Sequence, residues 1–196
     1  MNLMVWKIIM KIFGWKIDEN FPKNLKRCVL IAVPHTSNWD FLFAIATFKI
    51  MKIDIKFTIK DTWVKFPFRL ISLPLGAISI DRTNKKEGEK GKSMVEYMTE
   101  LFSKNKDLVL IVTAEGTRKR VENWKTGFYY IAKNANVPIA LGYLDYDKKI
   151  CGIREKLINP SDLETDMKEI MEFYSKSTPK IKENFSLDKR YTRSDN

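Results

Sequence analysis

The segment CVLIAVPHTSNWDFLFAIATF, residues 28–48, decides the fold. Its first six residues are apolar and end at Pro34, which predicts a buried strand, and the apolar residues after position 40 predict a helix. The polar hexapeptide between them, residues 35–40, is therefore a junction from a strand to a helix. Functional side chains often gather at such junctions in α/β proteins.

The hexapeptide contains His35, the only histidine of the 196 residues, and Asp40 follows five positions later. If Ser37 or Asn38 caps the helix, Asp40 lies in the first helical turn and His35 just before it in the loop. A carboxylate so placed can accept a hydrogen bond from Nδ1 of the imidazole, which leaves Nε2 free to act as a general base. Taken alone, the pattern favours a capping or buried histidine, because six-residue motifs are frequent by chance.

Outward from this segment, apolar strands alternate with amphipathic helices. Such alternation predicts an α/β fold with a mostly parallel sheet flanked by helices. The expected strands are residues 28–33, 54–60, 76–81, 107–112 and 137–144. The expected helices are residues 38–49, 61–69, 87–103, 126–135 and 161–175. A turn at 145–149 predicts one more strand near 149–154, which would form an antiparallel hairpin at the edge of the sheet.

The composition is strongly basic, because 35 Lys and Arg face 24 Asp and Glu and give a net charge of +11. Such a surface attracts nucleic acid, anionic lipid headgroups or phosphorylated substrates. The cations are scattered rather than gathered in one block, which argues against a nucleic-acid-binding arm. Two cysteines and one histidine fit neither a disulfide framework nor a zinc site. We therefore expect neither a metal nor a bound cofactor.

Residues 3–17 predict an N-terminal amphipathic helix rich in aromatic residues, with Lys7 and Lys11 on one narrow stripe. Such a helix either lies in the headgroup region of an anionic bilayer or packs on the domain, and we favour the bilayer. No stretch has the roughly 18–20 uncharged apolar residues of a spanning helix, and no signal peptide is evident. The expected parts are a membrane-surface helix at 1–20, the main domain at 21–176 and a loosely ordered, polar basic tail at 177–196.

Two further predicted strands end in arginine motifs, one at Arg82 and one in the Glu-Gly-Thr-Arg sequence of residues 115–118. Because the carboxyl ends of parallel strands meet at one edge of a sheet, His35 and these motifs are expected to converge on one crevice. Lys60, at the end of another strand, should point to the same edge. A base beside guanidinium groups suits activation of a hydroxyl on a phosphate-bearing substrate. Singly, the motifs are also explained as a surface ion pair, a turn and a solvated lysine.

Together these motifs resemble the four sequence blocks of the glycerolipid acyltransferases, the family that includes 1-acylglycerol-3-phosphate acyltransferase. The look-alike blocks occur in the family's order as residues 35–40, 78–82, 115–118 and 137–139. The resemblance covers residues 29–143, and four blocks in order are far more specific than one. The four blocks together therefore favour a catalytic role for His35 over that of a capping or buried histidine. Ser79 departs from the family pattern, in which an aromatic residue is usual at this position.

The resemblance implies transfer of an acyl group from acyl-CoA or acyl carrier protein to the free hydroxyl of a lysophospholipid, without an acyl-enzyme. His35 would be the general base, and Asp40 would hold and polarise its imidazole. The residues implied to hold the acceptor phosphate are Arg82, Glu115, Gly116, Thr117, Arg118 and Lys60. Pro138 would form a wall of the acyl-binding region. The default acceptor is 1-acylglycerol-3-phosphate, which gives phosphatidic acid, and another lyso-lipid such as a lyso-ornithine lipid is an alternative.

The expected location is the cytoplasm, peripherally on the inner face of the cell membrane. The expected partners are an anionic membrane surface, the lysophospholipid and the acyl donor, and no nucleic acid. A competing hypothesis is a non-catalytic basic protein that docks on anionic lipid or nucleic acid, whose affinity would fall steeply with salt and would not need His35. A phosphatase is a weaker hypothesis, because the sequence offers neither a metal site nor a nucleophile for the displacement.

Overall fold

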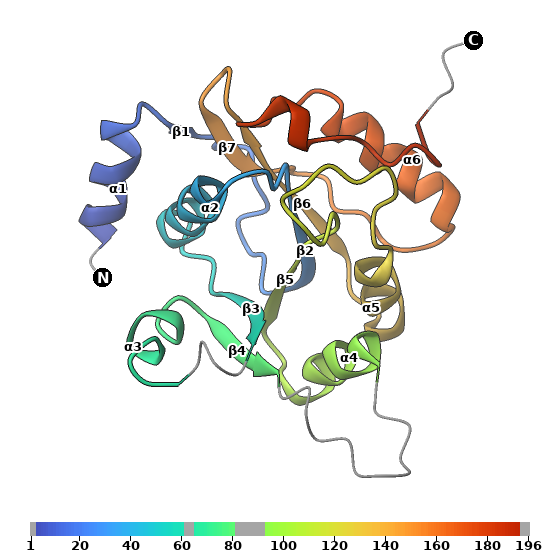
Figure 1. Ribbon diagram of the computed structural model, residues 1–196. Coiled ribbons are helices and arrows are strands. Elements are labelled where there is room, and N and C mark those ends of the chain that lie inside the picture. Colours follow the sequence, from blue (N-terminus) through green and yellow to red (C-terminus); the bar gives the residue numbers. More distant parts are fainter. Residues whose placement is uncertain (1–2, 61–64, 81–92, 193–196) are drawn as a thin grey trace.

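The sheet contains seven strands among the residues that the computed structural model describes, which are 3–60, 65–80 and 93–192. The strands are β1 Lys16–Ile17, β2 Arg27–Val33, β3 Ile55–Lys60, β4 Ala77–Ile80, β5 Leu108–Val112, β6 Ile139–Asp145 and β7 Ile150–Ile153. The helices are α1 Leu3–Ile12, α2 Asn38–Ile50, α3 Arg69–Ser72, α4 Met94–Lys104, α5 Gly127–Ala135, α6 Leu163–Tyr174 and a short 3-10 helix, Lys182–Asn184. Helices cover both faces of the sheet (Figure 1).

The strand order is β1-β7-β6-β2-β5-β3-β4, and β6 and β7 form the one antiparallel pair of neighbours in this sheet. The predicted α/β fold with a mostly parallel sheet and an antiparallel hairpin is therefore confirmed. The hairpin is one strand away from the edge, because β1 pairs with the outer side of β7. The two residues of β1 are too few to show a strand pattern in the sequence.

The middle of the sheet is buried on both faces, which explains the unbroken apolar run of β2. Val29, Ile31 and Val33 face the core under α4, α5 and α6. Cys28 and Leu30 face the other core, under α1 and α2. The strand thus joins the two cores and fixes where the loop after it begins.

The N-terminal helix α1 is shorter than expected and packs on the domain with one side. It ends at Ile12, and Gly14 adopts a φ of 71°, a left-handed conformation in which the chain turns into β1. Trp6 and Met10 are buried against the α2 core, whereas Ile8 remains half exposed. None of the helices in residues 3–60, 65–80 and 93–192 is long and apolar enough to cross a membrane.

Two other expectations differ from the structure. Of the described residues in the short helix expected at 61–69, only Arg69 is helical, and α3 continues from there to Ser72; residues 61–64 lie outside the described part. The tail is not loosely ordered between positions 177 and 192. The indole N–H of Trp124 donates to the carbonyl of Ser186 at 2.9 Å, and the fully buried Asp188 accepts the backbone N–H of Trp124 at 2.9 Å. The tail thus packs on the loop between β5 and α5.

Candidate active site

Two polar side chains meet where the parallel neighbours β2 and β5 end. His35 lies two residues after β2, and Glu115 lies three residues after β5. The backbone N–H of His35 donates to Oε2 of Glu115 at 2.8 Å. The predicted convergence of the first and third sequence blocks at one sheet edge is therefore confirmed for this pair.

Asp40 is held in the first turn of α2 by a capping box. Ser37 is the N-cap, and the carboxylate of Asp40 returns to the backbone N–H groups that precede the helix. Oδ2 accepts the N–H of Thr36 at 2.6 Å and that of Ser37 at 2.7 Å. The side chain is only 2% exposed. Its position is thus set by the backbone of the hexapeptide itself.

The second carboxylate oxygen of Asp40 is bound by a residue that sequence reasoning missed. The phenol of Tyr146, just after β6, donates a hydrogen bond to Oδ1 of Asp40. Burial raises the pKa of Tyr146, and this hydrogen bond raises it further, so the phenol stays protonated. Lys60 and Glu115 were selected because they lie at the carboxyl ends of parallel strands, which we call the strand-end rule. The same rule applies to Tyr146, which follows β6, the strand next to β2.

The imidazole of His35 is mainly controlled by burial. Burial lowers the pKa of His35, the negative charge of Asp40 raises it, and the positive charge of Arg118 lowers it. Among the described residues, the hydrogen bonds to Asp40 come from Thr36, Ser37 and Tyr146 and not from the imidazole ring. Asp40 therefore acts on the ring through space. The hydrogen bond expected from Nδ1 of His35 to Asp40 is absent from the bonds of these described residues. A lowered pKa keeps the imidazole neutral at pH 7, as a base requires.

Glu115 lies behind His35 rather than on the open surface, since it is only 4% exposed. Burial raises its pKa to about 8, the hydrogen bond from the N–H of His35 opposes this, and the charge of Asp40 adds to it. At neutral pH the carboxyl is therefore mostly protonated. In that form it does not add a negative charge to a site that would receive an anionic substrate.

The loop after Glu115 carries exposed cations at the same edge. Gly116 has a φ of 71°, and a Cβ there would lie 2.8 Å from side-chain carbons of Lys125. Lys125 and Arg118 are both exposed. Nζ of Lys180 lies 4.7 Å from the ring centre of Trp39, inside the hexapeptide. Lys125 and Lys180 were not singled out from the sequence, because neither follows a strand.

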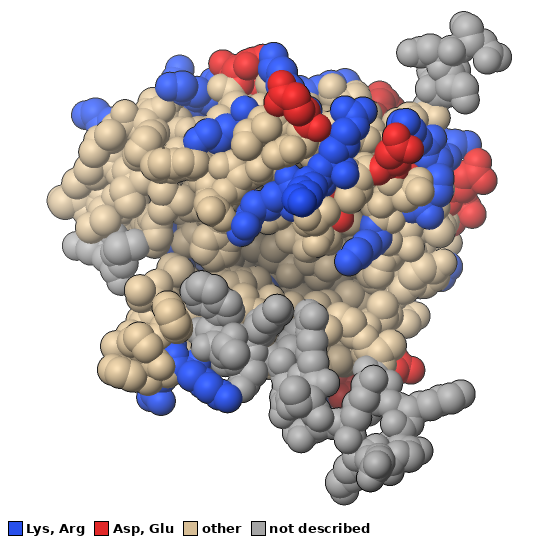
Figure 2. Space-filling model, in the orientation of Figure 1, with Lys and Arg blue, Asp and Glu red and all other residues tan. Residues whose placement is uncertain are grey.

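Figure 2 shows Lys and Arg side chains gathered across the middle of one face, above a hollow. A basic surface fits the role expected for the loop of residues 115–118, which is to hold a phosphate. In this loop Thr117 lies beside Arg118. The hydroxyl Oγ1 of Thr117 accepts the N–H of Lys119 at 3.3 Å, a local turn contact. The loop can therefore present cations and backbone groups to an anionic ligand.

The structure places one of the three remaining predicted residues away from this cluster. Pro138 precedes β6 at the opposite edge of the sheet, where its carbonyl accepts the N–H of Val29 at 3.0 Å. Its position therefore gives no support to a wall beside His35. Lys60 ends β3 at the edge where His35 lies. Arg82 lies outside the described residues.

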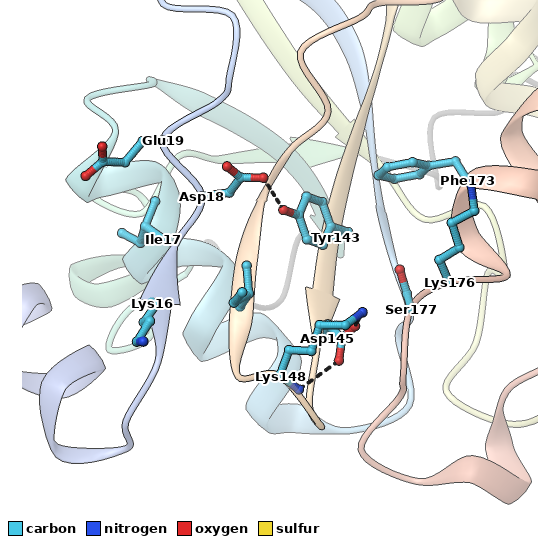
Figure 3. Close-up of a pocket in the computed structure, with 11 residues that line it drawn as sticks. Lys16, Ile17, Asp18, Glu19, Tyr143, Asp145, Lys148, Phe173, Lys176 and Ser177 are labelled. Carbon is cyan, nitrogen blue, oxygen red and sulfur yellow. Dashed lines mark hydrogen bonds and ion pairs between the residues drawn. The ribbon is translucent and has the colours of Figure 1, made fainter.

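A cavity of about 460 Å³ opens next to β6 and β7 (Figure 3). The phenol of Tyr143 donates to Asp18 on one wall, and Nζ of Lys148 pairs with Asp145 at 2.8 Å on another. None of the predicted site residues that the structure describes lines it. Its mixed charges indicate no particular ligand, so we place the candidate site by the chemistry around His35 and not by cavity size.

Comparisons with known proteins give the family and the fold of the chain. A family model described as acyltransferase matches residues 15–140, a range that includes His35, Asp40 and Glu115. The fold is similar to that of the 1-acyl-sn-glycerophosphate (LPA) acyltransferase PlsC from Thermotoga maritima. That match has a TM-score of 0.60 and 16% sequence identity, over 91% of this chain and 80% of that chain. A comparison with curated protein sequences gave no significant match.

Proposed function

Since the chain belongs to the acyltransferase family, we propose that it moves a fatty acyl group from acyl-CoA or acyl carrier protein to the free hydroxyl of a lysophospholipid. The observation that carries the proposal is the His35 loop, with Glu115 behind its backbone and the fixed carboxylate of Asp40 beside it. The proposed acceptor is 1-acylglycerol-3-phosphate, and the product is phosphatidic acid. The cations beside the site and the LPA acyltransferase with a similar fold support this acceptor.

His35 would act first as a base and then as an acid. Its neutral imidazole takes the proton of the acceptor hydroxyl while the hydroxyl oxygen attacks the thioester carbonyl carbon. The tetrahedral intermediate then collapses, the C–S bond breaks, and the leaving thiolate takes the proton from the imidazolium. The charge of Asp40 stabilises that imidazolium through space, which fits its effect on the pKa of His35. Base catalysis of this kind contributes about 10²- to 10⁴-fold in rate.

The acceptor phosphate would be held mainly by Arg118, with backbone groups of Gly116 and Thr117 beside it. Arg118 is exposed and close enough to His35 to lower its pKa. Lys125 lies against Gly116 and can add a second cation. Roles for Lys60, Arg82 and Pro138 remain part of the proposal that rests on the family resemblance alone. Glu115 would support the backbone of His35 rather than touch the phosphate.

The lipid acceptor implies that the protein works at a membrane. We propose peripheral binding on the cytoplasmic face of an anionic bilayer, with α1 as one contact. Ile12 is 73% exposed and Met4 is 64% exposed, while Lys7 and Lys11 are exposed on the same helix. This combination of apolar and basic side chains is typical of helices that lie in the headgroup region.

The test is an acyl-transfer assay with purified protein on liposomes, labelled acyl-CoA or acyl carrier protein, and a panel of lyso-lipids that includes a lyso-ornithine lipid. Wild-type protein should acylate 1-acylglycerol-3-phosphate. His35→Ala should remove turnover and keep vesicle binding. Undiminished turnover in His35→Ala would disprove the mechanism. Preference for another lyso-lipid would correct the acceptor, and vesicle binding without turnover on any lyso-lipid would favour a non-catalytic lipid-binding protein.

A further inference from the structure

The segment around α3 exposes an unusual number of large apolar side chains. The exposed fractions are 78% for Phe66, 49% for Phe68, 65% for Leu70, 69% for Ile71 and 47% for Leu73. The helix itself has no buried residue. Single exposed apolar residues are normal in water-soluble proteins, but a contiguous patch of them marks a surface that meets something apolar.

This patch lies on the same face of the sheet as α1 and α2. Nζ of Lys49 in α2 donates to the carbonyl of Pro74, just after α3, at 3.3 Å. In the first turn of α2, the ring of Trp39 lies 5.3 Å from that of Phe13, which follows α1. In Figure 1, α1 lies to the left of α2 and α3 lies below it. Trp39 and Phe41 are themselves 42% and 41% exposed. The apolar surface therefore continues from α1 across the start of α2.

The charges on this face indicate the kind of surface that it binds. Residues 3–17, 38–53 and 65–77 contain Asp40 as their one acidic residue, and Asp40 is buried, whereas Asp54, directly after the second of these segments, is exposed and pairs with Lys56 at 3.0 Å. The cations of these three segments are Lys7, Lys11, Lys16, Lys49, Lys52, Lys65 and Arg69. By contrast, α6 on the other face carries Glu164 and Glu172, each paired with a lysine four residues later. A surface on which basic and apolar side chains predominate is complementary to an anionic lipid surface.

We propose that α3 and its flanks, residues 66–73, form a second bilayer contact that works together with α1. The exposed apolar side chains enter the boundary between headgroups and acyl chains, and Arg69 faces the headgroup phosphates. A second copy of the chain fits this face poorly, because a two-fold contact would bring the seven cations of these segments against the same cations of the other copy. The inference rests on the proposed membrane association and extends it to a second element.

The contact also has a consequence for the lipid substrate. Trp39 and Phe41 lie four and six positions after His35, between the two anchoring elements. A protein seated on α1 and α3 therefore holds the loop of His35 toward the headgroup layer. The acceptor could then reach the base while its acyl chain stays in the leaflet, so the lipid need not be extracted into water.

A fluorescent label tests the contact directly. Cys28 and Cys151 are fully buried, and burial raises the pKa of both thiols to about 12, so a new surface cysteine can be labelled selectively. Ile71→Cys with an environment-sensitive dye should show a blue-shifted, stronger emission on vesicles of phosphatidylcholine with phosphatidylglycerol. The same dye at Tyr130→Cys, on α5 of the opposite face, should not change. An unchanged Ile71 label on vesicles that do bind the protein would overturn the proposal.

A partition experiment measures how much α3 contributes. Phe66→Gln combined with Ile71→Gln should weaken binding to the same vesicles at least tenfold. Tyr130→Gln is the matched control at an exposed aromatic residue, 45% exposed, and should bind as wild type does. Thermal unfolding checks that both variants fold. Equal binding by the double variant would overturn the role of α3.

These assays use no acyl donor, so they do not depend on turnover. If wild-type protein and the variants all fail to bind vesicles, both the membrane association and the role of α3 are wrong, even when acyl transfer to detergent-dispersed lipid succeeds. If the Ile71 label instead shifts with protein concentration in the absence of lipid, and sedimentation shows a dimer, the face is an interface between copies and the proposal is overturned.

Discussion

The phenol of Tyr146 binds Oδ1 of Asp40, so this carboxylate is held on one oxygen by a residue that lies 106 positions away in the chain. Its other oxygen accepts backbone N–H groups of the hexapeptide itself. The carboxylate therefore cannot turn without losing a hydrogen bond on one of the two oxygens. Tyr146 thus positions the charge that acts on His35.

Tyr146→Phe removes this hydrogen bond with little change of shape. The negative charge of Asp40 is then no longer offset by the phenol hydrogen, which should raise the pKa of His35. The acidic limb of the pH profile, where activity falls as His35 becomes protonated, should therefore move to higher pH. We expect kcat to fall about tenfold, in line with the loss of one charge-assisted hydrogen bond. The measurement is kcat against pH for the acyl-transfer reaction.

Tyr143→Phe is the matched control for this change. Tyr143 also donates its phenol proton to an aspartate, Asp18, but in the neighbouring cavity. This variant should leave the acidic limb where it is. If both variants shift the limb equally, or if neither does, Tyr146 has a structural role only.

In the wild-type enzyme, activity should be lost only at a pH below the usual pKa of histidine. Burial lowers the pKa of His35 below its usual value of 6.5. A base works only when it is unprotonated, so activity should fall as the pH drops through this lowered pKa and stay high above it. A pH profile of kcat/KM for the free enzyme measures this value. A limb clearly above 6.5 would contradict the arrangement, because it would mean that the charge of Asp40 outweighs burial.

Glu115 should make stability depend on pH in the neutral range. Its pKa is raised from 4.5 to about 8 in the folded protein, so between these values the folded state holds a proton that the unfolded state has lost. The free energy of unfolding should therefore fall as the pH rises from about 5 to 8, by on the order of a few kcal/mol from this one group. Glu115→Gln keeps an acceptor for the N–H of His35 and removes the ionisation.

Urea unfolding at several pH values measures this difference. The free energy of unfolding of Glu115→Gln should decline less from pH 5 to 8 than that of wild type. Glu122→Gln is the control, because the pKa of this exposed glutamate is lowered by Lys189 and it is ionised in both states above pH 5. Parallel slopes for wild type and Glu115→Gln would show that the buried carboxyl is ionised at neutral pH.

The strand-end rule explains which site residues could be found from the sequence. His35 and Glu115 follow strands with long apolar runs, so their shared edge is predictable from the apolar pattern alone. Tyr146 follows such a strand too, but its partner is decided by how the turn between β6 and β7 folds back on α2. Pro138 was selected by motif similarity, and the register of β6 with β2 puts it at the other edge.

The parts of the fold that were missed depend on contacts distant in the sequence. The tail after position 177 is polar, and it is ordered by the contacts of Ser186 and the buried Asp188 with Trp124. The two-residue strand β1 exists because β7 offers it a free edge, which no local pattern reveals. In contrast, the alternation of strands and helices is a local property and was predicted correctly.

Arg118 should affect the acceptor far more than the acyl donor. Arg118→Ala removes an exposed guanidinium close to His35, so we expect KM for 1-acylglycerol-3-phosphate to rise about tenfold or more, with less change in KM for the donor. Arg120→Ala, at another exposed arginine two positions later, is the control for a general loss of charge and should change KM little. The difference should shrink at high salt, which screens a charged contact at an open surface.

Equal losses in Arg118→Ala and Arg120→Ala would mean that the whole basic surface, and not a defined phosphate contact, attracts the acceptor. A loss in Arg118→Ala that persists with an uncharged acceptor would place this arginine at the thioester instead.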